Sequence, residues 1–415
     1  MRQVHSVPRT AVMYVYPWVL HDEGIEPALE QLAACGIGTL QLAVNYHIAT
    51  YLVPRDPRRR IWAGEQGALY FDPHDGSSGA WPVAPPLSSV VDDARYLPVL
   101  LAAAAAHGFP VIAWVVYLYN HALARQRPEL AVQNVFGDRN QAQLCPSHPS
   151  VRRYALDLTT AAVGLGTFDG LVCESLSFLP YDYGFLNLKA AVLPGPRSRL
   201  LLGLCFCEHC CAAARDAGGD VDALAAEMRQ AIDDDLAGLP DRSHHADADE
   251  AWSNHAFSGR LRALLDARTQ QATSLQLDVL RVAEDAGLAV GSTAVEVADE
   301  RVSGVSGHVI KPRLDELRVE IMADTSVAAI SGMVRSARAE APERTPVYAL
   351  YQLSGYDSES SFVRAVERAC EAGIRHFRFY EYGLLTRRQL EWLRGARHLW
   401  SRDDTVDTRV ERGPP

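Results

Sequence analysis

The strongest constraint on the fold of this chain is a regular alternation of strand-like and helix-like segments along almost its whole length. Eight apolar runs have the length and the β-branched and aromatic content of buried strands. These runs are residues 11–18, 39–46, 110–119, 170–175, 288–295, 317–322, 346–353 and 374–382. Helix-like segments lie between them, and several end in a glycine, which favours a left-handed helix cap. Eight strands, each followed by a helix, predict an α/β fold of the (β/α)8 TIM-barrel type.

A doubly wound open sheet is the structural alternative to the barrel. That fold often carries a GxGxxG turn after its first strand, and no such turn follows residues 11–18. With 415 residues, 48% of them hydrophobic, the chain is long enough for one large barrel core. We therefore expect a catalytic barrel over residues 1–400, with a Cys-containing subdomain inserted at about 176–260 after the fourth strand, and a disordered tail at 401–415. A second long interval, residues 47–88, also follows a strand, so both should lie on the C-terminal face, where barrel active sites are built.

The charge balance narrows the range of partners. Forty Lys and Arg oppose fifty-one Asp and Glu, which gives a net charge of −11, and no basic run could follow a line of phosphates. No apolar stretch of the sequence approaches the length of a membrane span. The sequence therefore predicts neither nucleic acid nor membrane as a partner, and it is compatible with a homodimer. Eight cysteines, four of them crowded into residues 205–211, make a poor disulfide framework, which indicates a reducing, cytoplasmic location.

Polar residues of the strands should face the barrel interior. Side chains alternate between the two faces of a strand, and the outward face of a barrel strand packs on helices, so it should be the more apolar. In residues 317–322 this rule turns Arg318, Glu320 and Met322 inward. In the other strands it turns inward Gln41, Asn45, His47, Val172, Glu174, His376, Arg378 and Tyr380. A polar lining at the strand ends suits a polyhydroxylated ligand, because every hydroxyl needs a partner once water is excluded.

Aromatic and polar side chains at the same level are candidate sugar contacts. Aromatic rings offer flat apolar faces to sugar rings, and Tyr117, Tyr181 and Tyr356 belong to this aromatic set. Two similar triplets, residues 45–47 and 119–121, end the second and third strands, where they could hydrogen-bond substrate hydroxyls or cap loops. The substrate-binding candidates are Trp18, Asn45, His47, Trp114, Tyr119, Asn120, His121, Arg318, Arg378 and Tyr380. For each aromatic residue taken alone, a place in the core is the alternative.

A series of motifs in the first half of the chain resembles a known superfamily. In order, the motifs are YVYPW, LAVNYH, AWVVYLYN, PELAVQNVFGD, LCPSHPSVR, DGLVCESL and LGLCFCEHC, within about residues 11–215. The series is similar to glycoside-hydrolase-like (β/α)8 proteins, and among them to a largely uncharacterised bacterial group. The resemblance implies a carbohydrate-active hydrolase whose acidic motif residue is Glu174, at the end of the fourth strand. The loop that follows, YDYGFLNLKAAV, lacks the histidines common in that group, which implies a changed substrate or a lost activity.

The chemistry of glycoside hydrolysis requires a second carboxyl group. One group protonates the leaving oxygen, and the other acts as nucleophile or activates water. We select Glu320 to accompany Glu174, because many glycosidase barrels pair carboxylates of the fourth and sixth strands and because Glu320 passes the inward-facing rule. The alternatives are Glu296, Asp324, Asp357 and Glu381, and for Glu320 an ion pair with Arg318 or Arg378 is the structural explanation. The sequence thus predicts a glycoside hydrolase that acts on a small glycoside or oligosaccharide.

Two other functions fit the same residues. A divalent metal, as in sugar isomerases or lyases built on barrels, could be held by His47, His121, Glu174 and Glu320. No HExxH motif enforces such a site. A barrel that binds a carbohydrate without turning it over is the third interpretation.

The cysteine-rich stretch CFCEHCC is a candidate structural zinc site. Three thiolates would come from Cys205, Cys207 and Cys210, and the tetrahedron could be completed by Cys145, His209 or Cys211. The stretch lies well past the end of the fourth strand, so we assign it no catalytic role. Reduced, metal-free cysteines are the alternative, and the predicted reaction requires no cofactor.

Overall fold

The computed structural model describes residues 11–73, 81, 83–166, 168–185, 188–191, 193–238, 258–296 and 299–401. Almost all of the predicted tail therefore lies outside the described residues, as does part of the predicted inserted subdomain. Among the described residues, no helix is both long enough and apolar enough to cross a bilayer.

The eight predicted strands are confirmed, in their predicted order, as one parallel sheet. Around the sheet the order is β11, β10, β7, β2, β1, β14, β13, β12, so the chain passes around it in one direction, from β1 to β11 and then from β12 to β14, which pairs again with β1. The strands are β1 (Ala11–Val15), β2 (Ile37–Ala43), β7 (Val111–Val116), β10 (Gly170–Glu174), β11 (Ala289–Ser292), β12 (Leu317–Glu320), β13 (Val347–Gln352) and β14 (His376–Tyr380). Asp315 brings the two outer strands together, because its N–H donates to the Val290 carbonyl and its carboxylate accepts from the Val290 N–H, each at 2.9 Å. The sheet is thus a nearly closed (β/α)8 barrel.

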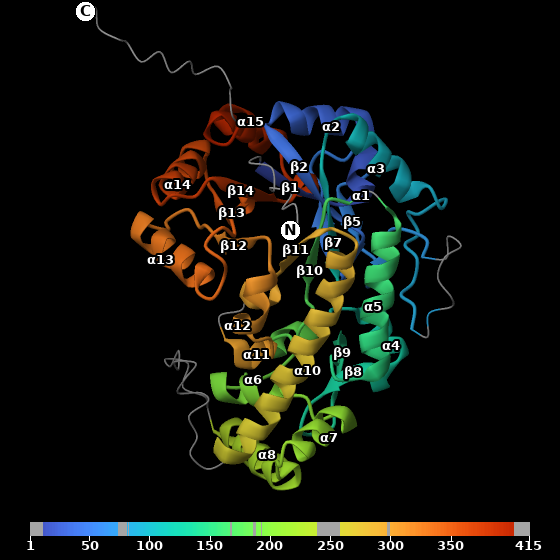
Figure 1. The fold of residues 1–415 in the computed structure, drawn as a ribbon, viewed down its shortest axis with the longest axis vertical. Helices are drawn as coiled ribbons and strands as arrows, with labels where there is room; N and C mark the ends of the chain where they lie inside the picture. The colour runs from blue at the N-terminus through green and yellow to red at the C-terminus, as the bar shows by residue number, and fades with distance from the viewer. Residues whose placement is uncertain are drawn as a thin grey trace, which may run out of the picture.

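Helices surround this sheet, as a barrel requires (Figure 1). The main outer helices are α2 (Ile25–Ala34), α3 (Tyr96–Ala106), α5 (Pro149–Gly164), α10 (Ser258–Asp285), α13 (Val327–Arg338), α14 (Glu359–Glu371) and α15 (Arg387–Ala396). Shorter helices lie in the connections: α1 (Pro17–Glu23), α4 (His121–Gln126), α11 (Glu300–Ser303) and α12 (Gly307–Ile310). The fifth strand departs from the predicted repeat, because only the short α11 and α12 follow it.

Capping residues explain where the last three barrel helices begin. The side chains of Ser326 and Ser358 accept hydrogen bonds from backbone N–H groups of the first turns of α13 and α14. Thr386 and Gln389 form a complete capping box at the start of α15. Each cap satisfies N–H groups that the helix itself leaves unpaired.

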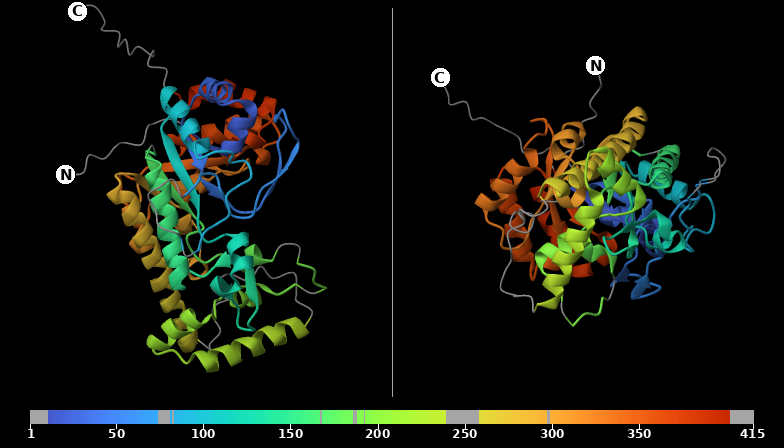
Figure 2. Two further views of the ribbon diagram at one scale, coloured as in Figure 1. Left: turned by 90° about the vertical axis from the view of Figure 1, so that its right-hand side faces the viewer. Right: turned by 90° about the horizontal axis from the view of Figure 1, so that it is seen from below.

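Additional structure gathers at the C-terminal end of the strands. Small antiparallel pairs follow the second and third barrel strands: β3 (Asn45–Tyr46) with β6 (Ala68–Leu69), β4 (Thr50–Leu52) with β5 (Ile61–Ala63), and β8 (Ala131–Gln133) with β9 (Arg139–Leu144). Between β10 and β11 lie α6 (Pro196–Leu202), α7 (Glu208–Asp216) and α8 (Val221–Ala237), beyond one end of the barrel (Figure 2). Together with the start of α10 they enclose a second apolar core that includes Leu201, Leu224, Met228, Ile232 and Leu264.

The inward and outward faces of the strands follow the predicted alternation where ring contacts reveal them. Phe377 and Phe379 pack outward against Trp400, in the helical layer. Glu320, the last residue of β12, and Met322, just beyond it, are exposed, Met322 by 50%, and Glu320 accepts a hydrogen bond from Gln352. Neither side chain is therefore enclosed in the barrel interior.

A buried ion pair fills the lower part of the barrel. The fully buried guanidinium of Arg378 donates to the Glu316 carboxylate and to the side-chain oxygen of Gln41, and it lies 4.5 Å from the centre of the Tyr348 ring. Glu316 is only 6% exposed. The position of Arg378 is therefore that of a structural residue.

Replacing Arg378 by Met should destabilise the fold strongly, because it would leave the Glu316 carboxylate buried without its cation. We expect a loss of about 3–5 kcal/mol in the free energy of unfolding, measured by chemical denaturation. Arg95→Met is the matched control, since its ion pair with Asp93 is well exposed, and it should change stability by less than about 0.5 kcal/mol. Similar losses in the two variants would contradict the structural role of Arg378.

Candidate active site

Glu174 ends the fourth barrel strand with its carboxylate in the barrel mouth. Trp114, on the adjacent strand β7, donates its indole N–H to the Glu174 Oε2 at 2.5 Å, and His47 Nε2 lies 3.9 Å from Oε1. The side chain keeps 22% of its surface exposed, so a ligand can reach it. Burial raises the pKa of Glu174 to about 7, although the Trp114 hydrogen bond and the charge of Arg318 oppose the rise. Near neutral pH this carboxyl group therefore exchanges a proton readily.

Glu296 approaches from the neighbouring fifth strand and is held by an arginine. It ends a 3₁₀ turn (Ala294–Glu296) just after β11, the strand that pairs with β10. Arg318, from β12, donates from Nε to Glu296 Oε1 at 2.7 Å and from Nη1 to the Tyr14 hydroxyl at 2.7 Å. Burial raises the pKa of Glu296, and Arg318 opposes that rise. About a third of the side chain (32%) is exposed, which weakens the effect of burial.

The two carboxyl groups act on each other electrostatically. The charge of Glu296 contributes to the raised pKa of Glu174, and Arg318 lowers the pKa of both. Glu174 and Glu296 therefore belong to one site, with Arg318 in direct contact with Glu296 alone.

Three tyrosine hydroxyls line the same mouth. The Tyr380 hydroxyl is 3.0 Å from that of Tyr16 and 3.0 Å from that of Tyr46. Burial raises the pKa of Tyr380 to about 12, and it also raises the pKa values of Tyr16 and Tyr46 well above their usual value. The charge of Glu174 contributes at Tyr46 and Tyr380, so these two phenols lie near the carboxylate. All three remain neutral and can donate or accept hydrogen bonds.

Histidine and tyrosine rings form another wall beside Glu174. The His47 ring stacks on Tyr46 (4.1 Å between ring centres) and lies 4.5 Å from the Tyr119 ring. Tyr119 in turn contacts His121 and, from the segment after β10, Tyr183. Burial lowers the pKa of both histidines to about 4, so they are neutral at ordinary pH.

Several residues that were predicted to contact substrate have structural roles instead. Asn45 bridges the second and third strands, exchanging hydrogen bonds with the Val116 carbonyl and N–H at 2.5 and 2.9 Å. Asn120 caps α4 and donates to the Gly67 carbonyl, which is the loop-cap alternative for this residue. Trp18 is only 2% exposed and stacks on Trp62 at 4.3 Å. These three residues and Arg378 therefore hold the structure around the site.

The further aromatic candidates divide between the hydrophobic core and the segment after β10. Tyr117 is fully buried and shares a hydrogen bond with Thr159 at 2.9 Å, and the buried Tyr356 donates to the Ile321 carbonyl. Tyr181 lies in the 3₁₀ turn Tyr181–Gly184 after β10, against Phe185. Tyr117 and Tyr356 are therefore core residues.

The structure changes the choice of the second carboxyl group. Glu320 is exposed and bonded to Gln352, and it does not contribute to the pKa of Glu174. Glu381 is fully buried, and its carboxylate accepts hydrogen bonds from the backbone N–H groups of Tyr16 and Leu384, so it is tied to the backbone. Glu296, one of the alternatives from the sequence, is the carboxyl group that shares the site with Glu174.

Sequence reasoning named Tyr119 and Tyr380 but missed Tyr14, Tyr16 and Tyr46, as well as the contacts of Arg318 with Glu296 and Tyr14. Tyr14 and Tyr16 alternate along the first strand, which is the signal that they share one face. Tyr46 stands in the triplet with Asn45 and His47, but it was not singled out. The inward direction of Arg318 was correct, whereas its partners came from segments far apart in the sequence.

Within the described residues, the potential metal ligands that converge are cysteines. Cys145, Cys205, Cys207 and Cys210 place their sulfur atoms within 4.8 Å of one another. The predicted trio of cysteines is thus joined by Cys145, one of the three candidates for completing the set. In the same part of the chain, Glu320 is exposed and bonded to Gln352, and it does not form a group of metal ligands with His47, His121 and Glu174.

No protein-family model matches the sequence, and no curated protein matches it either. Comparison of folds is more informative. An α-L-fucosidase from Paenibacillus thiaminolyticus superposes with a TM-score of 0.57 at 13% identity, over 94% of this chain and 49% of its own. The catalytic domain of a β-amylase from Paenibacillus polymyxa gives 0.55 at 10% identity, over 94% and 97%. A β-galactosidase from the psychrophilic Marinomonas ef1 gives 0.54 at 10% identity, over 94% and 59%.

The fold is one that solved glycoside hydrolases share. The barrel spans nearly the whole β-amylase catalytic domain, but only about half of the fucosidase chain and 59% of the β-galactosidase chain. At these identities the likeness concerns the fold alone. The chemistry of this chain has to be argued from its own side chains.

Proposed function

We propose that this protein is a glycoside hydrolase in which Glu174 protonates the glycosidic oxygen and Glu296 is the ionised partner. The observation that carries the proposal is the pair of carboxyl groups at neighbouring strand ends in contrasting environments. Glu174 has a pKa of about 7 and forms no ion pair with an arginine among the described residues, whereas Glu296 is in direct contact with Arg318. Environments that separate two carboxyl groups in this way divide the roles of acid and base between them.

The proposed reaction begins with Glu174 in its protonated form. The proton passes to the leaving oxygen as the bond to the anomeric carbon breaks and positive charge develops on the sugar. The Glu296 carboxylate, kept ionised by Arg318, then attacks that carbon or removes a proton from the attacking water. Tyr46 and Tyr380 are placed to hydrogen-bond sugar hydroxyls, the fully buried Tyr16 holds the Tyr380 hydroxyl from behind, and the ring of Tyr119 offers an apolar face.

The substrate class follows from the lining of the mouth. Neutral tyrosines and histidines beside two acids suit an uncharged, polyhydroxylated molecule, so we propose a small glycoside or oligosaccharide. The fold neighbours are a fucosidase, a β-amylase and a β-galactosidase, and their activities support a sugar substrate. All eight cysteines lie in the described part of the chain and none of them forms a disulfide, which supports a reducing compartment such as the cytoplasm.

The experiment is a screen of the purified protein against a panel of 4-nitrophenyl glycosides, with both anomers of each common sugar. Release of nitrophenol from at least one member is expected. A protein that binds a sugar from the same panel without releasing nitrophenol would contradict the proposal and favour the non-catalytic barrel.

The pH dependence of kcat/KM should reflect the pKa of the general acid, Glu174. Because burial raises the pKa of Glu174 to about 7, the catalytic proton is present below pH 7 and is lost as the pH rises through that value. We expect kcat/KM to fall about tenfold for each pH unit well above 7. A profile that stays flat from pH 6 to about pH 9 would contradict the assignment of Glu174 as the acid.

A further inference from the structure

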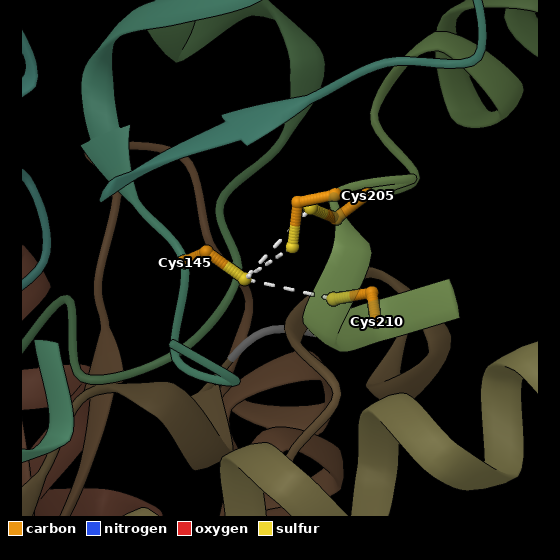
Figure 3. A group of neighbouring side chains, drawn as sticks. Cys145, Cys205 and Cys210 are labelled. Atoms are coloured by element: carbon orange, nitrogen blue, oxygen red, sulfur yellow. Dashed lines mark hydrogen bonds between the residues drawn. The ribbon is translucent and has the colours of Figure 1, made fainter. Parts of the chain in front are cut away.

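Four cysteines far apart in the sequence meet at the junction between the barrel and the segment inserted after β10. Cys145 directly follows β9, Cys205 and Cys207 precede α7, and Cys210 lies in its first turn. Figure 3 shows the labelled side chains of Cys145, Cys205 and Cys210 pointing toward one another. All four cysteines are at most 3% exposed.

The sulfur spacing fits a tetrahedral metal ion. Cys145 Sγ lies 3.6 Å from Cys207 Sγ, 3.5 Å from Cys210 Sγ and 3.8 Å from Cys205 Sγ. A regular tetrahedron with zinc–sulfur bonds of about 2.3 Å has sulfur–sulfur edges of about 3.8 Å. The observed spacings are far longer than a disulfide bond of about 2.0 Å.

Hydrogen-bond donors are arranged around the sulfur atoms. The backbone N–H of Gln133 points at Cys205 Sγ at 3.5 Å, and the Ser147 hydroxyl lies 3.2 Å from Cys210 Sγ. With a thiolate at Cys210, the Ser147 hydroxyl would become the donor. Such outer contacts orient thiolate ligands and support their negative charge.

An arginine without a carboxylate partner supplies an independent reason to expect negative charge here. Arg268 of α10 is 2% exposed, and its guanidinium lies 3.7 Å above the Phe178 ring. It donates from Nη2 to the Val302 carbonyl at 2.8 Å, while its Nε and Nη1 have no hydrogen-bond partner in the described part of the chain. Burial lowers the pKa of Arg268, and Cys210, Cys205 and Cys145 oppose that effect. Four thiolates around a divalent ion carry a net charge of −2, and this negative charge would offset that of the buried cation.

We propose that Cys145, Cys205, Cys207 and Cys210 bind one zinc ion in a closed structural site that fastens the inserted segment to the barrel. The four thiols release their protons to solvent as the ion enters. Because all four positions are protein sulfur, no open position remains for a substrate or water, and the site has no catalytic role.

The site would join two pieces of the active-site wall. On one side it holds the β8–β9 hairpin, whose Gln143 pairs with Tyr119, and on the other it holds the segment that carries Tyr183. The Phe206 N–H also donates to the Gln133 carbonyl at 2.6 Å across this junction. A bound zinc ion would therefore fix the position of the Tyr119 and Tyr183 rings relative to each other.

The test is the metal content of the purified full chain, measured by inductively coupled plasma mass spectrometry. We expect one zinc per chain in the natural protein and in Cys211→Ser, and almost none in Cys205→Ser. Cys211 is the matched control, because it is adjacent to Cys210 but donates to the Phe206 carbonyl instead of joining the four. Metal-free natural protein, or a full equivalent of iron in place of zinc, would overturn the proposal.

A second measurement covers the case in which Cys205→Ser fails to fold. Protein stripped of metal by a chelator is titrated with cobalt(II), and the visible absorption is recorded. Tetrahedral cobalt with four thiolates gives intense bands that saturate at one equivalent and that zinc abolishes. Weak bands typical of octahedral cobalt, or no saturation at one equivalent, would overturn the four-cysteine site.

Discussion

Glu174→Gln is expected to lower kcat/KM by about 10²–10⁴ on glycosides with a poor leaving group. The amide keeps the shape of the side chain and can still meet the Trp114 indole, but it has no proton to give. The 2,4-dinitrophenolate group leaves without needing a proton. On 2,4-dinitrophenyl glycosides the kcat/KM of the variant should therefore stay close to that of the natural protein. The comparison is made by steady-state kinetics on the two kinds of substrate.

Two controls separate this loss from a damaged fold. Glu320→Gln should behave as the natural protein on both substrates, because Glu320 is exposed and outside the site. Above pH 7, the free energy of unfolding of Glu174→Gln should also be larger than that of the natural protein by about 1–3 kcal/mol, because the substitution removes a carboxylate whose pKa is raised by burial. That gain is absent below the unfolded pKa, where the carboxyl group is protonated in both states. Equal losses of activity on the two substrates would contradict the role of Glu174 as acid.

Glu296→Ala is expected to lower kcat by at least about 10³-fold on every substrate, including those with good leaving groups. The loss does not depend on the leaving group because the partner carboxylate acts on the anomeric carbon or on the attacking water. The substitution leaves a space beside Arg318, whose Nε loses its partner. A small anion such as azide should enter that space, restore part of the rate and yield a glycosyl azide.

The outcome with azide distinguishes a catalytic carboxylate from a merely structural ion pair. If Glu296 only neutralised Arg318, azide would restore stability without forming a glycosyl azide. Glu381→Gln is the comparison, since its carboxylate binds the Tyr16 and Leu384 N–H groups and its loss should give no azide product. The product is identified by mass spectrometry.

The strands of this fold were predictable because both faces of each barrel strand are buried, and such strands appear in the sequence as continuous apolar runs. The same alternation placed Arg318 and Glu174 on the inward face, since both lie within regular strands. It could not tell which strand-end carboxyl groups share a site, because Glu320 ends β12 just as Glu174 ends β10, yet Glu320 is exposed and bonded to Gln352. It could not select Glu296, because a residue in a 3₁₀ turn after β11 has no alternating face.

The cysteine site shows a different limit of sequence reasoning. The short spacing of Cys205, Cys207 and Cys210 suggested a metal site by itself. Cys145 lies sixty residues earlier, and only the packing of the β8–β9 hairpin against the start of α7 brings it to the other three. Contacts of that kind depend on the folded chain, so the sequence left three candidates for the fourth ligand.

The most direct test of the central claim is a crystal structure of Glu174→Gln with a bound sugar substrate. The proposal predicts a glycosidic oxygen within hydrogen-bonding distance of the introduced amide and an anomeric carbon facing the Glu296 carboxylate. Sugar hydroxyls should meet the Tyr46 and Tyr380 hydroxyls. A sugar bound elsewhere, or one whose anomeric carbon faces away from Glu296, would contradict the proposed pair of carboxyl groups.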